Sequence, residues 1–177
     1  MFHAMTESPL PRHLRVRLLL HLRTMPAVVV TGARQTGKST LVRALIPGPR
    51  RFHSLDDLDV VDLARRDPEA LVGGQEPVTL DEVQREPDLL LAVKRAVDRH
   101  PVPGRFVLTG SANLLLMRRV SESLAGRAGY LVLWPMTRRE QLGLGRCGLW
   151  EDLLRTEERS WQEVLRQAAT DPSPIHI

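Results

Sequence analysis

The sequence lacks the features of several classes of protein. Its single cysteine, Cys147, excludes an internal disulfide framework and fits a reducing compartment. Aromatic residues make up only 4 % of the chain, which disfavours a stacking surface for single-stranded nucleic acid. No uncharged apolar run approaches the roughly 18 residues of a membrane span, and the first ten residues lack the apolar block of a secretory signal. We therefore expect a soluble, cytoplasmic protein without a membrane partner.

The sequence also lacks groups of residues at the spacing of metal ligands, and it has few lysines. The six histidines do not cluster, and Cys147 has no histidine beside it, so zinc and thiol chemistry are not supported. Lys38 and Lys94 are the only lysines among 25 basic residues. The net charge of +4 and the pI near 10.1 permit contact with nucleic acid, although arginines spread over a solvated surface are the simpler interpretation.

The apolar content of 42 % in 177 residues is enough for one domain with its own core. Short β-branched or apolar runs alternate with helical patterns along the chain. The expected strands are residues 27–31, 51–55, 77–80, 105–109 and 130–134, and the expected helices are residues 9–24, 38–46, 58–72 (with a second turn opened by Asp67-Pro68), 88–100 and 114–124. This alternation predicts an α/β fold, a three-layer αβα sandwich around a mostly parallel five-stranded sheet.

The pattern changes after Pro135. Residues 137–140 have the form of a capping box that opens a short helix, and residues 151–169 favour a polar helix. We therefore expect an N-terminal helical segment (1–24), a core (25–140), and a helical C-terminal extension with a frayed tail (141–177).

A glycine-flanked loop is the first motif that carries chemistry. Residues 32–39 (GARQTGKS) match the P-loop pattern G-x-x-x-x-G-K-[ST] and lie between a buried strand and a helix. We expect Gly32 and Gly37 to adopt backbone angles closed to other residues, so that inward-turned amides hold phosphate. Lys38 is predicted to reach the β and γ phosphates, and Ser39 to offer its hydroxyl to Mg²⁺. The predicted nucleotide-binding residues are Gly32, Ala33, Arg34, Gln35, Thr36, Gly37, Lys38, Ser39 and Thr40, with Arg34 and Gln35 at the crest facing solvent or a neighbouring subunit.

Two adjacent carboxylates form the second motif. Asp81 and Glu82 follow an apolar strand, at the end where open α/β sheets bind their ligands. Asp81 is the candidate to hold Mg²⁺ through its water shell, and Glu82 is the candidate to orient or deprotonate an attacking water. Adjacent acids are common on any surface, but their place at a strand end behind a P-loop favours the functional interpretation.

Two further residues are candidates for catalysis. Ser111 ends the fourth expected strand and is predicted to contact the γ-phosphate or the attacking water, with Thr109 and Asn113 as its alternatives. A helix N-cap is the other interpretation of Ser111. Arg127 precedes the last strand and is the candidate to reach the γ-phosphate of a neighbouring subunit in a homo-oligomer. A solvated arginine is its alternative.

Five segments together resemble a known family. They are, in order, VVVTGARQTGKSTLVRAL, FHSLDDLDVVDLARRDPEAL, PVTLDEVQREPDLLLAVKRAVD, RFVLTGSANLLLM and SLAGRAGYLVLWPMT. They resemble the ATPase core of a prokaryotic AAA-type family whose members carry a C-terminal nuclease-like or winged-helix-like domain, and the resemblance covers about residues 14–140. It implies a P-loop fold of the additional-strand type, ATP and Mg²⁺ as ligands, and site roles for Lys38, Ser39, Asp81, Glu82, Ser111 and Arg127.

Members of that family usually continue well past the fifth strand, whereas this chain ends at Ile177. A truncated reading frame and a core that works with a separate partner are both open. The leading hypothesis is a Mg²⁺-dependent ATPase that couples its nucleotide state to a partner. The alternative is a nucleotide-gated binding module with negligible turnover that contacts DNA or a protein. A small-molecule kinase is disfavoured, because the paired acids suit the activation of water and no arginine-rich lid follows the fourth strand.

Overall fold

The computed structural model describes residues 9–111, 124–143, 153–154 and 156–170. Its five strands all run parallel, and their order in the sheet is β2-β3-β4-β1-β5. They are β1 (Ala27–Gly32), β2 (Arg51–Ser54), β3 (Val78–Asp81), β4 (Phe106–Ser111) and β5 (Ala128–Val132). The strand that leads into the P-loop therefore lies between the strand of Ser111 and the last strand, which confirms the additional-strand arrangement.

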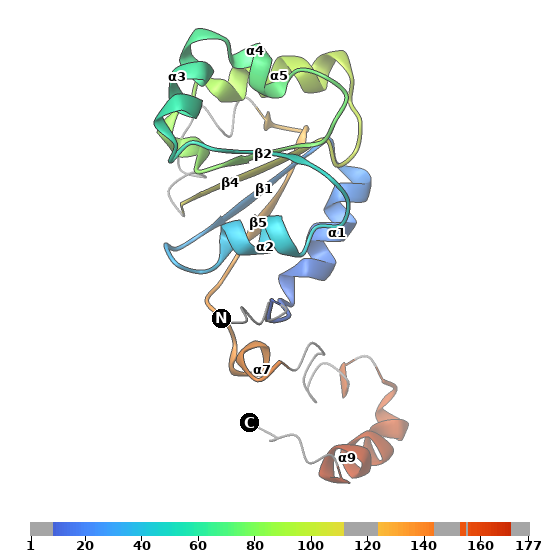
Figure 1. Cartoon of the computed structure of the whole chain (residues 1–177). Helices are drawn as coiled ribbons and strands as arrows, with labels where there is room; N and C mark the ends of the chain where they lie inside the picture. The colour runs from blue at the N-terminus through green and yellow to red at the C-terminus, as the bar shows by residue number, and fades with distance from the viewer. Residues whose placement is uncertain (1–8, 112–123, 144–152, 155, 171–177) are drawn as a thin grey trace, which may run out of the picture.

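Helices cover both faces of this sheet (Figure 1). One face carries α1 (Leu14–Thr24) and α2 (Lys38–Ala44), and the other carries α3 (Leu58–Arg66), α4 (Pro68–Val72) and α5 (Leu89–Arg99). The predicted three-layer αβα sandwich is thus confirmed. The remaining described elements are the 3₁₀ helix η1 (Val83–Arg85) after β3, and α7 (Arg138–Gln141), η3 (Glu158–Ser160) and α9 (Trp161–Thr170) after β5. No helix in the described part of the chain is long and apolar enough to cross a membrane.

The core lies on both sides of β1, which is buried at every position. Val28 and Val30 face α1 and α2, where they join Leu18 and Leu41 in one apolar cluster. Val29 belongs to the other cluster, between the sheet and α3, α4 and α5. A strand buried on both faces has no place for polar alternation, and its β-branched side chains suit the pleated surface. This strand, paired on both sides, gives the P-loop a rigid base.

Helix boundaries follow the local chemistry of the chain. The helical region expected at 58–72 is two helices, because Asp67 ends α3 and caps α4 by accepting a hydrogen bond from the Ala70 amide (3.1 Å), with Pro68 at the first helical position. The capping box expected at 137–140 is present. The Thr137 hydroxyl accepts from the Glu140 amide (3.2 Å) and the Glu140 carboxylate accepts from the Thr137 amide (2.8 Å).

Three expectations need correction. The helix expected at 9–24 begins only at Leu14, and residues 9–12 are not helical. The single helix predicted over 151–169 is wrong, because the chain turns at residues 156–160 before α9 begins. The Trp161 indole N–H donates to the Thr156 carbonyl (3.1 Å), which a continuous helix would pair with the Ser160 amide. The last strand covers residues 128–132 and not 130–134. Asn113 and nearly all of the helix expected at 114–124 lie outside the described residues.

Candidate functional site

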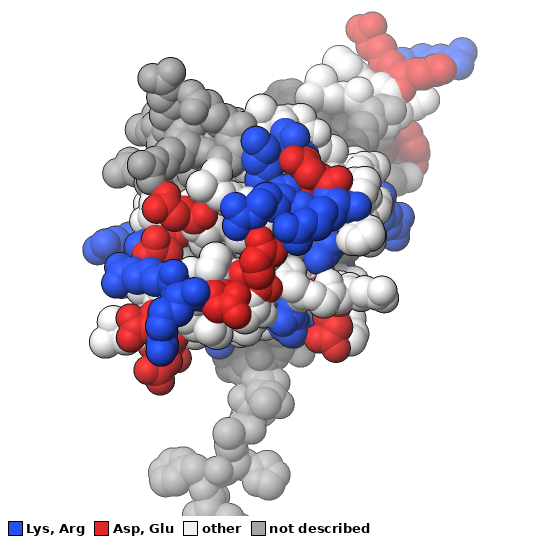
Figure 2. Space-filling model, turned by 90° about the horizontal axis from the view of Figure 1, so that it is seen from above, with Lys and Arg blue, Asp and Glu red and all other residues white. Residues whose placement is uncertain are grey.

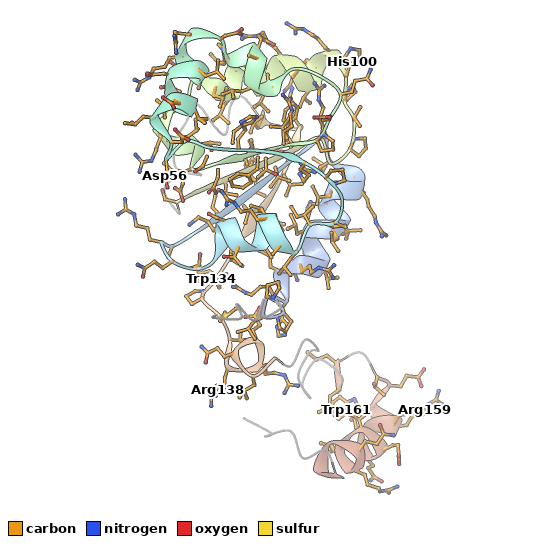
Figure 3. The ribbon with its side chains drawn as sticks, viewed as in Figure 1. Asp56, His100, Trp134, Arg138, Arg159 and Trp161 are labelled. Carbon is orange, nitrogen blue, oxygen red and sulfur yellow. The ribbon has the colours of Figure 1, made fainter. Side chains whose placement is uncertain are left out.

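The carboxyl ends of the parallel strands meet at one edge of the sheet. β1 ends at Gly32 and β4 at Ser111, and these two residues lie opposite each other in the strand register. β3 ends nearby at Asp81. Figure 3 shows the two edges: Asp56, which follows β2, lies on the P-loop side, and His100, which precedes β4, lies on the other. The topology therefore brings together the P-loop, the acid pair and Ser111.

The P-loop surrounds a buried ammonium group. The Lys38 side chain belongs to a residue only 5 % exposed, and its Nζ donates to the carbonyl oxygens of Ala33 (3.0 Å) and Gly32 (3.3 Å). Gly37 has φ +87° at the N-cap of α2, and Gln35 has φ +62°. Backbone in this left-handed region turns successive amides toward one side, and the start of α2 adds its positive end. The loop therefore presents positive potential from an ammonium, a helix terminus and backbone amides.

The two glycines of the motif serve different purposes. Gly37 has the left-handed φ that favours glycine, as expected, but Gly32 does not have such an angle. A Cβ at Gly32 would lie 2.3 Å from the carbonyl oxygen of Leu133, which follows β5. Our expectation that Gly32 supplies an unusual backbone angle is thus wrong: its lack of a side chain permits a close backbone approach. Arg34 and Gln35 are exposed at the crest, as expected.

Ser39 and Asp81 face each other across the gap between α2 and β3. The Ser39 hydroxyl donates to both carboxylate oxygens, at 2.8 Å to Oδ2 and 3.2 Å to Oδ1. Thr109 on β4 also donates to Asp81 Oδ1. The described residues contain no group of three or more His, Cys, Asp or Glu side chains that could enclose a metal. One hydroxyl and one carboxylate fit Mg²⁺, which prefers hard oxygen ligands and keeps waters and phosphate oxygens in its shell.

Glu82 has a strained backbone and is held by two neighbouring side chains. Its φ of +58° is left-handed, which is uncommon for a residue other than glycine and is found at functional sites. The Glu82 amide donates to Thr109 Oγ1 (3.3 Å), and the Glu82 carboxylate accepts from the side-chain amide of Gln84. The other end of Gln84, Oε1, accepts from the Ser111 amide (3.2 Å). Gln84 therefore links the Glu82 carboxylate, which directly follows β3, to the end of β4.

Gln84 did not figure among the sequence candidates. The 3₁₀ helix η1 turns the chain back directly after Glu82, which brings a residue two positions further on beside the carboxylate. The sequence signal for Gln84 is its place as a polar residue shortly after the acid pair. This signal is weak, because turns that follow strands often contain polar residues. Ser111 ends β4 beside Gly32, and its role at the γ-phosphate stays a prediction. The hydroxyl of Thr109, its alternative, bonds to the Asp81 carboxylate and to the Glu82 amide.

Arg127 lies at the opposite edge of the sheet from its own P-loop. It directly precedes β5, and its carbonyl accepts from the amide of Ala27 (3.3 Å), the first residue of β1. Its guanidinium binds the carboxylate of Asp98 on α5, which lowers the pKa of that carboxyl. The structure thus does not bring Arg127 to the site of its own chain, and its action on a neighbouring subunit stays a prediction.

Two cavities lie near the sheet edges. A cavity of about 360 Å³ adjoins the P-loop and is lined mainly by apolar groups, including Leu10, Leu41 and Met136, together with Thr40 and Arg12. Trp134, which follows β5, lies in this region between α2 and α7 (Figure 3). A larger cavity, about 670 Å³, lies at the opposite edge, where the buried Arg105 binds the carbonyl oxygens of Ala96, Val72 and Gly74 near the ends of α5 and α4. Of these two cavities, the smaller adjoins the phosphate-binding loop, through Gln35, Thr36 and Gly37.

The helical face formed by α3, α4 and α5 carries charges of both signs side by side (Figure 2). Arginines there pair with carboxylates, as in Arg65 with Glu86 (2.7 Å) and Arg95 with Glu69 (2.9 Å). Such intermixing is typical of a solvated surface, where each pair contributes little to stability. On this face the simpler interpretation of the arginine content therefore holds.

The comparisons with known proteins agree with this geometry. A family model described as an AAA domain matches residues 24–142, which include all five strands and the P-loop. The chain belongs to this AAA-domain family. It is thus a P-loop ATPase domain at the level of the family, and its fold class and resemblance are confirmed.

Two curated relatives and a solved structure are similar to this AAA domain. The uncharacterized proteins Mb2031c of Mycobacterium bovis and Rv2008c of Mycobacterium tuberculosis are each 39 % identical to it over 141 residues, which is 78 % of this chain. The chain spans about a third of their length, since the match covers 32 % of each. The Walker-type ATPase PABY2304 of Pyrococcus abyssi superposes with a TM-score of 0.51 at 17 % identity, covering 86 % of this chain and 61 % of that one, and shares its fold.

Proposed function

We propose that this AAA domain binds ATP together with Mg²⁺ and hydrolyses the γ-phosphate bond with water. The observation that carries the proposal is the contact between Ser39 and Asp81, 2.8 Å apart at the mouth of the P-loop, with Glu82 as the next residue. A hydroxyl and a carboxylate side by side next to a phosphate-binding loop can both coordinate one divalent cation, which in turn binds a phosphate oxygen. A turn that served only the fold would not need the ammonium of Lys38 buried inside it.

Each residue of the site has a proposed role. The loop amides and Lys38 hold the phosphates, and Ser39 and Asp81 hold Mg²⁺. The metal, when bound, neutralises charge that develops on the phosphate oxygens. Glu82 is held by Thr109 and Gln84 with its carboxylate fixed, and it orients the attacking water and accepts its proton. Ser111 lies beside Gly32 in the register and contacts the γ-phosphate end of the site.

The cavity beside the P-loop is the proposed place of the base and ribose. Its volume of about 360 Å³ lies within the range of small-molecule pockets, which are mostly apolar with a few polar groups. Leu10 and Met136 come from segments before α1 and after β5, so parts of the chain far apart in sequence would enclose one ligand. An apolar lining suits stacking against a flat purine.

Titration calorimetry with ATP and MgCl₂ tests the binding step. We expect Lys38→Ala to weaken binding about 10- to 100-fold, because it removes charge-assisted hydrogen bonds of about 1.5–3 kcal/mol each. Lys94→Ala is the matched control, since it removes the only other lysine, on α5. Absence of heat from folded wild-type protein at millimolar ATP would overturn the proposal.

Phosphate release at high protein concentration tests the chemical step. We expect Glu82→Gln to bind ATP as tightly as wild type and to hydrolyse it at least about 100-fold more slowly, because an amide cannot accept the proton of water. Undiminished turnover in that variant would remove Glu82 from the mechanism. Binding of ATP without any release by the wild type would favour the second candidate, a nucleotide-gated module that contacts DNA or a protein.

A further inference from the structure

A buried arginine binds the P-loop through a backbone carbonyl and also lines the cavity beside the loop. Arg12 precedes α1 and is only 7 % exposed. Its guanidinium donates through Nη1 to the carbonyl oxygen of Thr36 (2.7 Å), through Nη2 to that of Trp134 (2.6 Å), and through Nε to Glu140 Oε1 (3.3 Å). Burying a guanidinium is costly unless its donors are paired, and three different segments supply the partners here.

The carboxylate partner of Arg12 is buried and well supported. Glu140 is 4 % exposed and accepts hydrogen bonds from the amides of His13 (2.7 Å) and Thr137 (2.8 Å) in addition to that from Arg12. Burial raises the pKa of Glu140, but the two amides and the Arg12 charge outweigh that effect and place its pKa below the usual value. Glu140 is therefore ionised at neutral pH, and it joins the start of α1 to the start of α7.

The contact with Thr36 acts on the phosphate-binding face of the loop through the planar peptide group. The carbonyl of Thr36 and the N–H of Gly37 belong to one trans peptide, so they point in opposite directions. With the carbonyl held by Arg12, the Gly37 N–H points to the far side of the loop. That amide begins the turn into α2, where the amides of a phosphate nest face their ligand.

We propose that Arg12 is a positioning residue that orients the Thr36–Gly37 peptide toward the phosphates, and that its ion pair with Glu140 couples nucleotide binding to the α7 segment. This inference rests on the proposed function, because it assigns a positioning residue and a coupling contact to the same nucleotide site. Because coupling between two sites is reciprocal, Glu140 must influence nucleotide affinity although it does not touch the P-loop, and nucleotide must stabilise α7.

Glu140→Gln separates the coupling from the fold of α7. Glutamine keeps the shape of the side chain and still serves a capping box, but it removes the charge that fixes Arg12. We expect it to weaken the binding of ADP with MgCl₂ about tenfold in calorimetry, a size usual for coupling between sites. Arg12→Gln should weaken binding at least as much, and the double variant should bind no more weakly than Arg12→Gln alone.

Two controls isolate this effect from loss of stability. Glu69→Gln removes a carboxylate that pairs with Arg95 and Arg99 on the opposite helical layer. Arg105→Gln removes another buried arginine with carbonyl partners, at the edge of the sheet away from the P-loop. Both should leave the dissociation constant of ADP for the folded protein unchanged.

Hydrogen exchange gives a second readout, and its first comparison uses the wild-type protein alone. ADP with MgCl₂ should slow exchange of the Gln141 and Leu142 amides, which bond to Thr137 and Arg138 in α7, and Glu140→Gln should abolish that slowing. If wild type binds ADP but α7 exchanges at the same rate with and without it, or if Glu140→Gln and Arg12→Gln bind as tightly as wild type, the coupling is overturned and the proposed function stands. If wild-type protein binds no nucleotide, both proposals fail together.

Discussion

The hydroxyl of Thr109 on β4 donates to the carboxylate of Asp81 on the neighbouring β3, and both residues are buried. The same hydroxyl oxygen accepts from the Glu82 amide (3.3 Å), so a single side chain fixes both acids of the candidate site. The register pairs Leu80 with Leu108, and the two polar residues follow that pair by one position on each strand. The acid pair is therefore held by the sheet itself and not by a mobile loop.

Thr109→Val should weaken Mg²⁺-dependent nucleotide binding by about tenfold, because valine keeps the volume but leaves Asp81 without its second donor. The lost hydrogen bonds should also reduce the free energy of unfolding by about 1–3 kcal/mol. Calorimetry with and without MgCl₂, and urea denaturation, measure the two effects. Thr79→Val is the control, because it removes another buried hydroxyl on β3 that binds Arg50 instead of the site. Equal metal dependence in wild type and Thr109→Val would contradict the role of Thr109.

Gln84→Ala should lower kcat for ATP hydrolysis by about tenfold and leave KM nearly unchanged. The Glu82 carboxylate loses the amide that orients it, while the phosphate-binding groups stay in place. Steady-state kinetics over a range of ATP concentrations distinguish the two parameters. Gln75→Ala, on the far side of the sheet, is the matched control. A rise in KM with unchanged kcat would show that Gln84 serves binding and not the orientation of Glu82.

Arg127→Ala should reduce ATP turnover by a factor on the order of 10³ if its guanidinium acts on a neighbouring subunit. Asp98→Asn is the control, because it disrupts the same ion pair and leaves the guanidinium present. Mixing Arg127→Ala with Glu82→Gln should restore part of the activity, since one kind of mixed site then contains both groups. Turnover by Arg127→Ala equal to that of wild type at every protein concentration would leave Arg127 as a surface ion-pair residue.

Acid should destabilise the protein partly through Glu140. Its pKa in the folded state lies below the usual value of 4.5, so below about that pH the unfolded state binds more protons. The stabilisation is complete above pH 4.5 and is lost as the pH falls through the lower, folded-state pKa. Urea denaturation between pH 3 and 7 should show a smaller loss of stability at the acid end for Glu140→Gln. Parallel pH profiles for the two proteins would contradict the shifted pKa.

The strands and the phosphate loop could be predicted because their signals are local. β1 is a continuous β-branched run, and Gly37, Lys38 and Ser39 follow it at fixed spacing, so chain connectivity alone places them together. The capping box at Thr137 and Glu140 and the break before Pro68 are equally local, and both were predicted. The break before α9 was missed because the Trp161 indole competes for a helix carbonyl, which periodicity does not reveal.

The sequence by itself determined the alternation of strands and helices, the P-loop and the acid pair at a strand end, since each depends on residues within a few positions of one another. Only the tertiary structure decided why Gly32 must lack a side chain, and that Gln84 and Arg12 belong to the site. Arg12 binds backbone carbonyls 24 and 122 residues away, and every residue type offers such a carbonyl. Such contacts do not depend on the residue type of the partner, so the sequence does not reveal them and the folded structure does.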